Sequence, residues 1–391
     1  MTGRALCIML VAAEPSGDAL GAGLMRALRK RLGEGVRFVG VGGAQMTAEG
    51  LHSPFDIAEL SIFGWFEGLM AYKKVMARVG ETAALAALET PDVAVLIDSW
   101  GFTLRVAHAL RAQAPGLKLI KYVGPQVFAS RPKRAYTLAR SVDHLLSILA
   151  FDAPYFEKAG LKVTAVGNPT LAKDMSGLDP QWLRDKLGAL PDDPILLVLP
   201  GSRRSEIARL MGPFGEAVAR LRAARPNLHV VLPLADSVAD QTRAAADLWP
   251  VKPFLVEGEK ARLDSMAGAT AALACSGTVT TELAMAGCPI VVAYRLGNIT
   301  HALVKLMIKT RYVTLINIAA DRFVAPELIQ DRCNPRDLAA ALAPLLDNPA
   351  FRRRKVEEQF EALDMLGPRD GPDPSERAAD AVIAIAEGRE P

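Results

Sequence analysis

One acidic residue follows an apolar run, at a position where it could take part in proton transfer. The run Val93–Ile97 has the length and composition of a buried strand, and Asp98 comes directly after it. Parallel α/β sheets bind ligands at the carboxyl ends of their strands, and a carboxylate there can act as a general base toward a hydroxyl group. The same carboxylate could instead accept hydrogen bonds from backbone N–H groups of the next turn, and the spacing leaves the two roles equally open.

A glycine turn with two arginines follows another apolar run. The expected strand Ile195–Leu199 ends in Pro-Gly-Ser-Arg-Arg-Ser-Glu, residues 200–206, where a helical pattern begins. Backbone N–H groups at a helix N-terminus bind anions, and an arginine such as Arg203 can hold a phosphate through two hydrogen bonds. We therefore expect an anion site here, although a serine-capped helix with surface arginines would show the same pattern.

A second element of this kind carries no acid in its first helical turn. The expected strand Ala271–Cys275 runs into Ser276, Gly277 and Thr278, which open a helix. A helix N-terminus without nearby negative charge is free to receive a diphosphate. Glu282 lies about one turn further and could accept hydrogen bonds from ribose hydroxyls. A capped core helix is the alternative, but the neighbouring arginine loop favours the diphosphate site.

The first helical pattern of the chain differs from these two. Glu14, Ser16 and Asp18 place negative charge at its start, which satisfies the helix dipole and repels phosphate. This helix start should therefore bind neutral hydroxyls or a backbone donor. Gly42 and Gly43 belong to a turn that brings the backbone close to either a helix or a ligand. The contrast assigns a nucleotide to the C-terminal half of the chain and an acceptor to the N-terminal half.

Two parallel sheets are needed to position these residues. Short apolar runs alternate with amphipathic segments, which is typical of an α/β fold with helices on both faces of each sheet. A turn-rich stretch at 168–180 interrupts the alternation, so we expect a Rossmann-like domain over 1–169, a second over 170–355, and a tail with a docking helix over 356–391. Ligands would then bind in the cleft between the domains. The expected strands are Ala5–Ala12, Arg37–Val41, Val93–Ile97, Lys118–Val123, His144–Ser147, Lys162–Val166, Ile195–Leu199, His229–Leu232, Pro253–Val256, Ala271–Cys275 and Pro289–Ala293, and the expected helices include Asp18–Leu32, Leu104–Ala112, Glu206–Ala224, Thr278–Ala286 and Ala378–Ala386.

Charge and cysteine content argue against several classes of protein. The 46 basic and 43 acidic side chains leave a net charge of +3, which does not indicate bulk nucleic-acid binding. The four cysteines include no Cys-x-x-Cys pair, so neither a disulfide framework nor a zinc site is expected, and a reducing, cytoplasmic setting fits. No apolar run reaches the roughly 18 residues expected of a membrane-spanning helix.

Residues 60–74 gather aromatic side chains next to two lysines. Phe63, Trp65 and Phe66 lie in this segment, in a chain that is only 6% aromatic. Apolar and aromatic residues flanked by positive charge suit the headgroup boundary of an anionic bilayer, and Leu303–Arg311 could add a second basic contact. A buried hairpin or helix is an equal alternative, since aromatic clusters are more often part of a core.

An ordered set of motifs resembles the lipid-A-disaccharide synthases, from about residue 5 to residue 345. No one piece is decisive, but their order along the chain is specific to that family. The set comprises Glu14-Pro15-Ser16-Gly17-Asp18, Gly40–Gly43 with Met46 and Glu49-Gly50, Ile97-Asp98, Tyr122-Val123, Pro200–Glu206, Ser276-Gly277-Thr278 with Glu282, Val292–Arg295, Tyr312-Val313 with Asn317, and Pro326–Leu328 with Gln330.

The resemblance implies a GT-B fold and an inverting glycosyl transfer. UDP-2,3-diacylglucosamine and 2,3-diacylglucosamine 1-phosphate would give the β(1→6)-linked disaccharide 1-phosphate and UDP. Asp98 would accept the proton of the acceptor 6-hydroxyl, Arg203 and the helix start at Ser276–Thr278 would stabilise the departing UDP, and Glu282 would hold the ribose. Arg295 and Asn317 would complete the substrate-binding residues. The resemblance also implies a peripheral enzyme at the inner face of the cytoplasmic membrane, with no metal and no other cofactor.

The chain departs from the family mainly in its N-terminal half, where the acceptor should bind. Residues 124–130 read Gly-Pro-Gln-Val-Phe-Ala-Ser where the family has Ser-Pro-Ser-Val-Trp-Ala-Trp, and residues 99–103 lack the family's second acid. Asn168 replaces a histidine, and Ile316 replaces the proline of Leu-Pro-Asn. These changes are compatible with a transferase that takes a different acyl-sugar acceptor. A UDP-sugar 2-epimerase and a non-catalytic sugar-nucleotide sensor would share the motifs of the C-terminal half, so these two alternatives are also open.

Overall fold

The protein forms two compact units, described by a computed structural model that covers residues 5–60, 68–297, 310–367 and 372–391. Unit 1 comprises Met1–Ala172 with Asp370–Pro391, and unit 2 comprises Lys173–Arg369. The chain therefore passes into unit 2 three residues after the boundary expected from the sequence. The segment expected to be one tail is divided, because the chain leaves unit 2 near residue 369 and its last helix packs on unit 1.

Unit 1 is built on a six-stranded parallel sheet with the order β2-β1-β3-β4-β5-β6. Its strands β1 and β3 are apolar and almost fully buried, as expected for a parallel sheet covered by helices on both faces. Each strand lies within two residues of its predicted bounds. The strands are β1 (Leu6–Ala12), β2 (Val36–Val41), β3 (Val93–Ile97), β4 (Lys118–Tyr122), β5 (His144–Ser147) and β6 (Lys162–Ala165).

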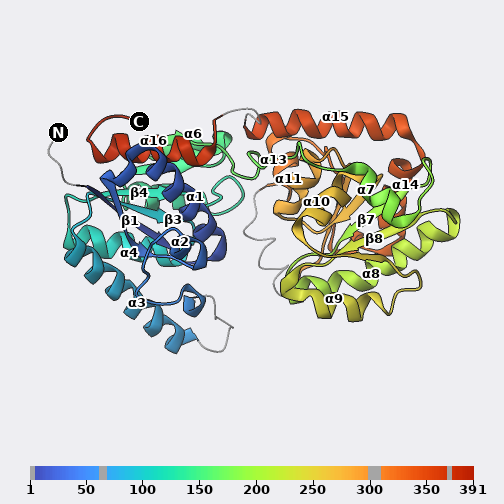
Figure 1. The fold of residues 1–391 in the computed structure, drawn as a ribbon, viewed down its shortest axis with the longest axis horizontal. Helices are drawn as coiled ribbons and strands as arrows, with labels where there is room; N and C mark the ends of the chain where they lie inside the picture. Colours follow the sequence, from blue (N-terminus) through green and yellow to red (C-terminus); the bar gives the residue numbers. More distant parts are fainter. Residues whose placement is uncertain (1–4, 61–67, 298–309, 368–371) are drawn as a thin grey trace. The chain divides into compact units, whose positions relative to one another are not determined.

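The helices of unit 1 bury separate apolar clusters against the two faces of this sheet. One face packs against α1 and α16, which lie side by side in Figure 1, and the other against α3 and α4. Ion pairs from Lys30 to Glu376 and from Arg31 to Asp380 connect α16 to α1. The helices are α1 (Pro15–Leu32), α2 (Ala44–Ala48), α3 (Gly68–Glu89), α4 (Trp100–Gln113), α5 (Arg134–Ala139), α6 (Ala153–Glu157) and α16 (Pro374–Ala386), with short 3-10 helices at Gly33–Gly35, Ile57–Leu60 and Ala150–Asp152.

Unit 2 contains a second six-stranded parallel sheet, with the order β12-β11-β10-β7-β8-β9. The strands are β7 (Ile195–Leu199), β8 (His229–Pro233), β9 (Phe254–Val256), β10 (Ala271–Ala274), β11 (Ile290–Tyr294) and β12 (Glu327–Ile329). The helices are α7 (Pro180–Leu187), α8 (Arg204–Ala224), α9 (Ala239–Ala246), α10 (Glu259–Gly268), α11 (Thr278–Met285), α13 (Leu315–Ala320), α14 (Pro335–Asp347) and α15 (Pro349–Leu366), with 3-10 helices at Asp236–Val238 and Gln330–Arg332. The prediction omitted β12, because a strand of three residues has too few apolar positions to show a pattern.

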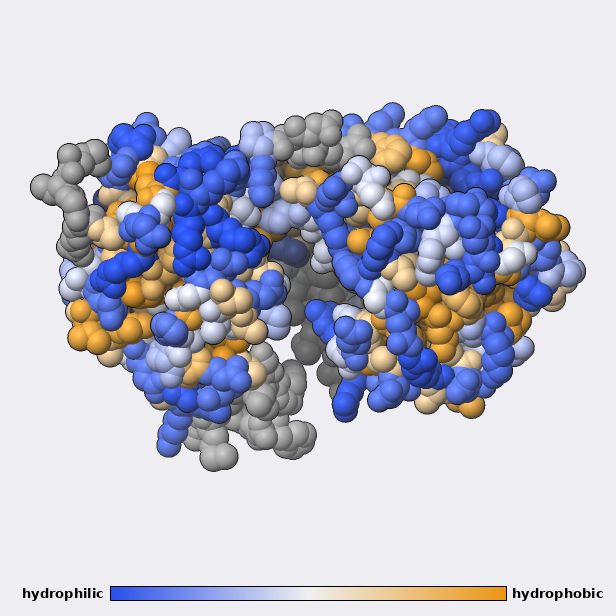
Figure 2. Space-filling model, viewed as in Figure 1, coloured by the Kyte–Doolittle hydropathy of each residue, from blue (hydrophilic) through white to orange (hydrophobic). Residues whose placement is uncertain are grey.

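The predicted α/β class, with two Rossmann-like parallel sheets, is confirmed. The face drawn in Figure 2 is largely polar over both units, with apolar residues in separate patches. Within the described ranges, no helix has both the length and the apolar character needed to cross a bilayer.

Candidate functional site

A pocket of about 470 Å³ opens at the carboxyl end of the sheet in unit 2. Its walls come from the segments that follow β7, β8 and β10, which is where open α/β sheets bind ligands. Arg203 lines the pocket, as do Ser276, Gly277 and Thr278. The structure therefore brings the two predicted anion-binding elements to one cavity, although they are some 70 residues apart in the sequence.

The N-terminus of α11 faces this pocket without a side-chain cap. Gly277 is its N-cap residue, and the first turn contains no acidic residue. A Cβ added to Gly277 would meet no atom within 4 Å, so the backbone borders open space at this point. Backbone N–H groups and the helix dipole together favour an anion at such a terminus. The diphosphate site remains a prediction, and the local geometry is the one it requires.

The arginine loop contributes its side chain rather than its backbone. The carboxylate of Glu206 accepts hydrogen bonds from the backbone N–H groups of Ser202 at 3.0 Å and of Arg203 at 3.2 Å. A buried carboxylate therefore occupies these two backbone groups, and the anion site expected at this loop stays a prediction. The Arg203 side chain is 76% exposed, and among the described residues its ion pair is with Glu206 at 3.0 Å. Its guanidinium keeps donors for a ligand in the pocket.

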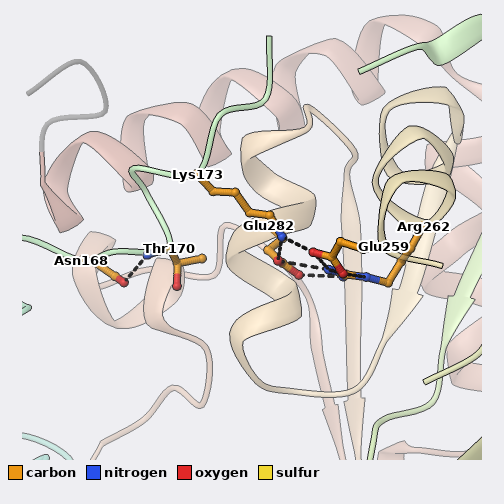
Figure 3. Close-up of polar contacts among 6 residues, drawn as sticks. All are labelled: Asn168, Thr170, Lys173, Glu259, Arg262 and Glu282. Atoms are coloured by element: carbon orange, nitrogen blue, oxygen red, sulfur yellow. Dashed lines mark hydrogen bonds and ion pairs between the residues drawn. The ribbon is translucent and has the colours of Figure 1, made fainter. Parts of the chain in front are cut away.

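Glu282 lies in a cluster of four charged residues beside the pocket (Figure 3). Its carboxylate accepts from Arg262 at 2.7 and 3.3 Å and from Lys173 at 2.9 Å, and Glu259 binds both cations. Burial alone would raise the pKa of Glu282, but the hydrogen bonds from Arg262 and Lys173 lower it below its ordinary value. Glu282 is therefore an ionised acceptor in a fixed position.

The partners of Glu282 could not be predicted from the sequence. Arg262 and Glu259 line the pocket, whereas Glu282 contacts Arg262 and is not itself among the lining residues. Arg262 and Glu259 both occur in α10, where charged residues resemble an ordinary solvated helix face. Lys173 lies 109 residues from Glu282, so no local pattern connects the two.

The structure corrects the substrate-binding role expected for Asn317. Its side chain is fully buried: the amide nitrogen donates to the carbonyl of Ala325 and to Glu327, each at 2.8 Å, and the amide oxygen accepts the backbone N–H groups of Val324 and Ala325. All four hydrogen-bonding positions of the amide are thus used within the protein. Asn317 holds the loop before β12 and has no donor or acceptor left for a ligand.

Arg295, directly after β11, also contacts another part of the protein. Its Nε donates to the carbonyl of Gln330 at 3.5 Å, and Arg295 is not among the residues that line the pocket. Asn168 accepts the backbone N–H of Thr170 at 3.0 Å and thereby closes a short turn (Figure 3). Neither contact provides an argument for or against a substrate role.

In unit 1, Asp98 lies at the carboxyl end of β3 and ends the strand in a left-handed turn. Asp98 and Ser99 have φ angles of +46° and +37°, and the backbone N–H of Asp98 donates to the backbone carbonyl of Tyr122 at 2.9 Å. The Ser16 hydroxyl, in the first turn of α1, donates to the Asp98 carboxylate at 3.2 Å. Backbone conformations of this kind are costly and occur preferentially at functional sites.

A second pocket, of about 560 Å³, opens beside this turn. Glu14 and Ser99 line it together with Arg105, and the remaining lining residues are mostly apolar, among them Phe102. Of the predicted acceptor residues, Glu14 therefore lies in a cavity, and Ser16 lies against Asp98. A mixed apolar and charged pocket of this kind suits an amphipathic ligand.

The remaining residues predicted to bind the acceptor, Asp18, Gly42 and Gly43, make their contacts within the protein. The buried carboxylate of Asp18 accepts the backbone N–H groups of Gly43, Gln45 and Met46 at 2.7 to 3.1 Å, so it caps α2. A Cβ on Gly42 would lie 2.8 Å from Met46, and one on Gly43 would lie 2.7 Å from Asp18. Asp18 was expected to bind either hydroxyls or a backbone donor, and the structure favours backbone donors. Gly42 and Gly43 were expected to lie close to either a helix or a ligand, and the structure favours the helix.

The residues predicted to contact a membrane, Phe63, Trp65 and Phe66, lie outside the described residues, as does most of the Leu303–Arg311 segment. Tyr72, in the first turns of α3, is described. The residue is 51% exposed, and its ring lies against the guanidinium of Arg105.

Comparison with known proteins gives a consistent result. The family model described as "Lipid-A-disaccharide synthetase" matches residues 8–369. The lipid-A-disaccharide synthase of Rhodospirillum centenum is 42% identical over 382 residues, which cover 98% of this chain and 95% of the relative. Two solved structures share the fold: the S. aureus MnaA–UDP co-structure, with TM-score 0.67, 16% identity and 99% of each chain covered, and the calicheamicin glycosyltransferase CalG4, with TM-score 0.58, 18% identity and 100% and 99% covered.

Proposed function

The chain belongs to the lipid-A-disaccharide synthase family and is thus a glycosyltransferase with a GT-B fold, and we propose that it condenses UDP-2,3-diacylglucosamine with 2,3-diacylglucosamine 1-phosphate. The products are the β(1→6)-linked disaccharide 1-phosphate and UDP. The observation that supports this proposal best is the pocket of unit 2, which is lined by both the uncapped N-terminus of α11 and Arg203.

The donor binds in this pocket through its diphosphate. The N-terminus of α11 and the Arg203 guanidinium neutralise the two phosphates, and their interaction strengthens as negative charge develops on the departing UDP. Glu282 binds the ribose. A carboxylate offers about four acceptor positions, and Arg262 and Lys173 occupy three of those on Glu282, so one remains for a ribose hydroxyl.

The acceptor binds to unit 1 near the end of β3. Asp98 accepts the proton of the acceptor 6-hydroxyl as its oxygen attacks the anomeric carbon of the donor, and the C–O bond to UDP breaks with inversion. The Ser16 hydroxyl, 3.2 Å from the carboxylate, holds Asp98 in position, and Glu14 offers an acceptor for a sugar hydroxyl in the adjacent pocket.

Both substrates carry acyl chains, so the enzyme meets them at a membrane surface. We propose peripheral binding to the inner face of the cytoplasmic membrane, through the aromatic segment 60–74 and its lysines. An anionic bilayer would attract these lysines, and salt would screen that attraction.

The other functions considered for the sequence are not favoured. The relative at 42% identity covers nearly the whole chain and is named for disaccharide synthesis. The likeness to solved structures at 16 to 18% identity shows the fold only, and the same fold also serves other chemistry.

A direct test incubates the purified chain with UDP-2,3-diacylglucosamine in detergent micelles, with and without 2,3-diacylglucosamine 1-phosphate. Mass spectrometry should detect the disaccharide 1-phosphate, and UDP should appear only when both substrates are present. Conversion of the UDP-sugar alone would indicate an epimerase, and binding without turnover would indicate a sensor. Turnover only with a different acyl sugar would show that the acceptor is a different one, and the proposed donor site would still hold.

A further inference from the structure

A lysine without an evident role is buried beneath the predicted base. Lys121 lies on the central strand β4, where it pairs in register with Leu96 of β3, and its residue is 3% exposed. Lysine is rarely buried to this extent unless its ammonium group has partners. Those partners should therefore show what the residue does.

The Lys121 ammonium donates to the backbone carbonyl of Asp98 and, at 2.8 Å, to the Thr103 hydroxyl. The Thr103 hydroxyl in turn lies 2.8 Å from the Asp98 carbonyl and 2.9 Å from that of Ser99. Lys121 and Thr103 thus hold the two consecutive residues whose φ angles are positive. The turn that places the Asp98 carboxylate is fixed from below by these two side chains.

The same ammonium supplies positive charge at this end of the sheet. Burial lowers the pKa of Lys121 from 10.5 to about 7, and the carboxylates of Asp98 and Glu14 oppose that shift. Arg105 of α4 lines the pocket beside this turn together with Glu14.

We infer that Lys121 is a positioning residue for Asp98: together with Thr103, it fixes the turn that aims the carboxylate. The inference rests on the proposed role of Asp98 as general base. Lys121 itself touches a backbone carbonyl and a hydroxyl and does not need to reach the substrate.

The test is the variant Lys121→Met, which keeps the length of the side chain and removes its charge. Thr103 can still donate to the Asp98 carbonyl in this variant, so that buried carbonyl is not left without a partner. We expect kcat to fall about 10- to 100-fold, as for a misplaced catalytic group, with the KM of the UDP-sugar and the affinity for UDP unchanged. A purely structural role would instead lower the yield of folded protein and leave kcat of the folded fraction unchanged.

Lys118→Met is the matched control, since Lys118 is the exposed first residue of the same strand and should tolerate the change. If Lys121→Met does not fold, Thr103→Val provides a second test. It removes one support of the turn and keeps the lysine, so kcat should again fall while the affinity for UDP stays unchanged. Wild-type kcat in either folded variant would overturn the inference.

Two further results separate this inference from the proposed function. A loss of folded protein in Lys121→Met, with wild-type kcat in the fraction that folds, would mean that the residue only stabilises the fold, and would also overturn the inference. If Asp98→Asn measured in parallel loses activity while Lys121→Met does not, the inference fails alone. If neither loses activity, the assignment of Asp98 as base fails with it.

Discussion

Replacement of Arg203 by alanine should weaken UDP binding and leave uridine binding unchanged. The side chain is 76% exposed and, in the described part of the chain, its ion pair is with Glu206, so little packing is lost. Glu206 keeps the backbone N–H groups of Ser202 and Arg203 and is not left unpaired. A hydrogen bond to a charged group contributes about 1.5–3 kcal/mol, which corresponds to a loss of affinity of about 10- to 150-fold.

Isothermal titration calorimetry with UDP and with uridine measures both affinities. Arg204→Ala is the matched control: Arg204 is the next residue, is also exposed, and is not among the residues that line the pocket. It should bind UDP as the wild type does. Equal losses for UDP and uridine in Arg203→Ala would point to a disturbed pocket, and unchanged UDP affinity would refute the assignment of Arg203 to the diphosphate.

Four further predictions concern Asp18, Asn317, Glu282 and the effect of a metal chelator. Asp18→Ala leaves three backbone N–H groups without an acceptor and should lower the free energy of unfolding by about 3 kcal/mol or more in urea denaturation, while UDP affinity stays the same. Asn317→Ala should likewise reduce stability, by about 1–3 kcal/mol or more, rather than act only on KM. Because the pKa of Glu282 is lowered in the fold, its ion pairs stabilise the protein above pH 4.5 and this stabilisation is lost as the pH falls below that value; the stability difference between wild type and Glu282→Gln should shrink accordingly. Activity should persist in EDTA, because an arginine and a helix N-terminus provide the countercharge for UDP; loss with EDTA and recovery with magnesium would contradict that.

The sequence was sufficient to predict the strands and the edge of each sheet at which chemistry should occur. A buried parallel strand is typically apolar along nearly its whole length, so the run Val93–Ile97 could be identified without the structure. The residues directly after such strands are then placed by topology alone. This is why Arg203 and Gly277 were expected near one site before their pocket was known.

Pattern could not separate residues that face a ligand from residues that hold the protein together. Asp18 and Asn317 occur in motifs of the family, but their polar atoms are used by backbone groups that only the folded chain brings near. The partners of Glu282 were not predicted for the same reason, since ion pairs across a fold leave no periodicity in the sequence. Lys121 was also missed, because one lysine within an apolar strand looks like an exception to the pattern.

The most direct test of the central claim compares Asp98→Asn with the wild type in turnover and in UDP affinity. The account predicts that disaccharide synthesis falls about 10²- to 10⁴-fold, the usual contribution of a general base, while UDP binds as before because its pocket lies in unit 2. Near wild-type turnover in a folded Asp98→Asn protein would contradict the account and would leave Asp98 a purely structural role.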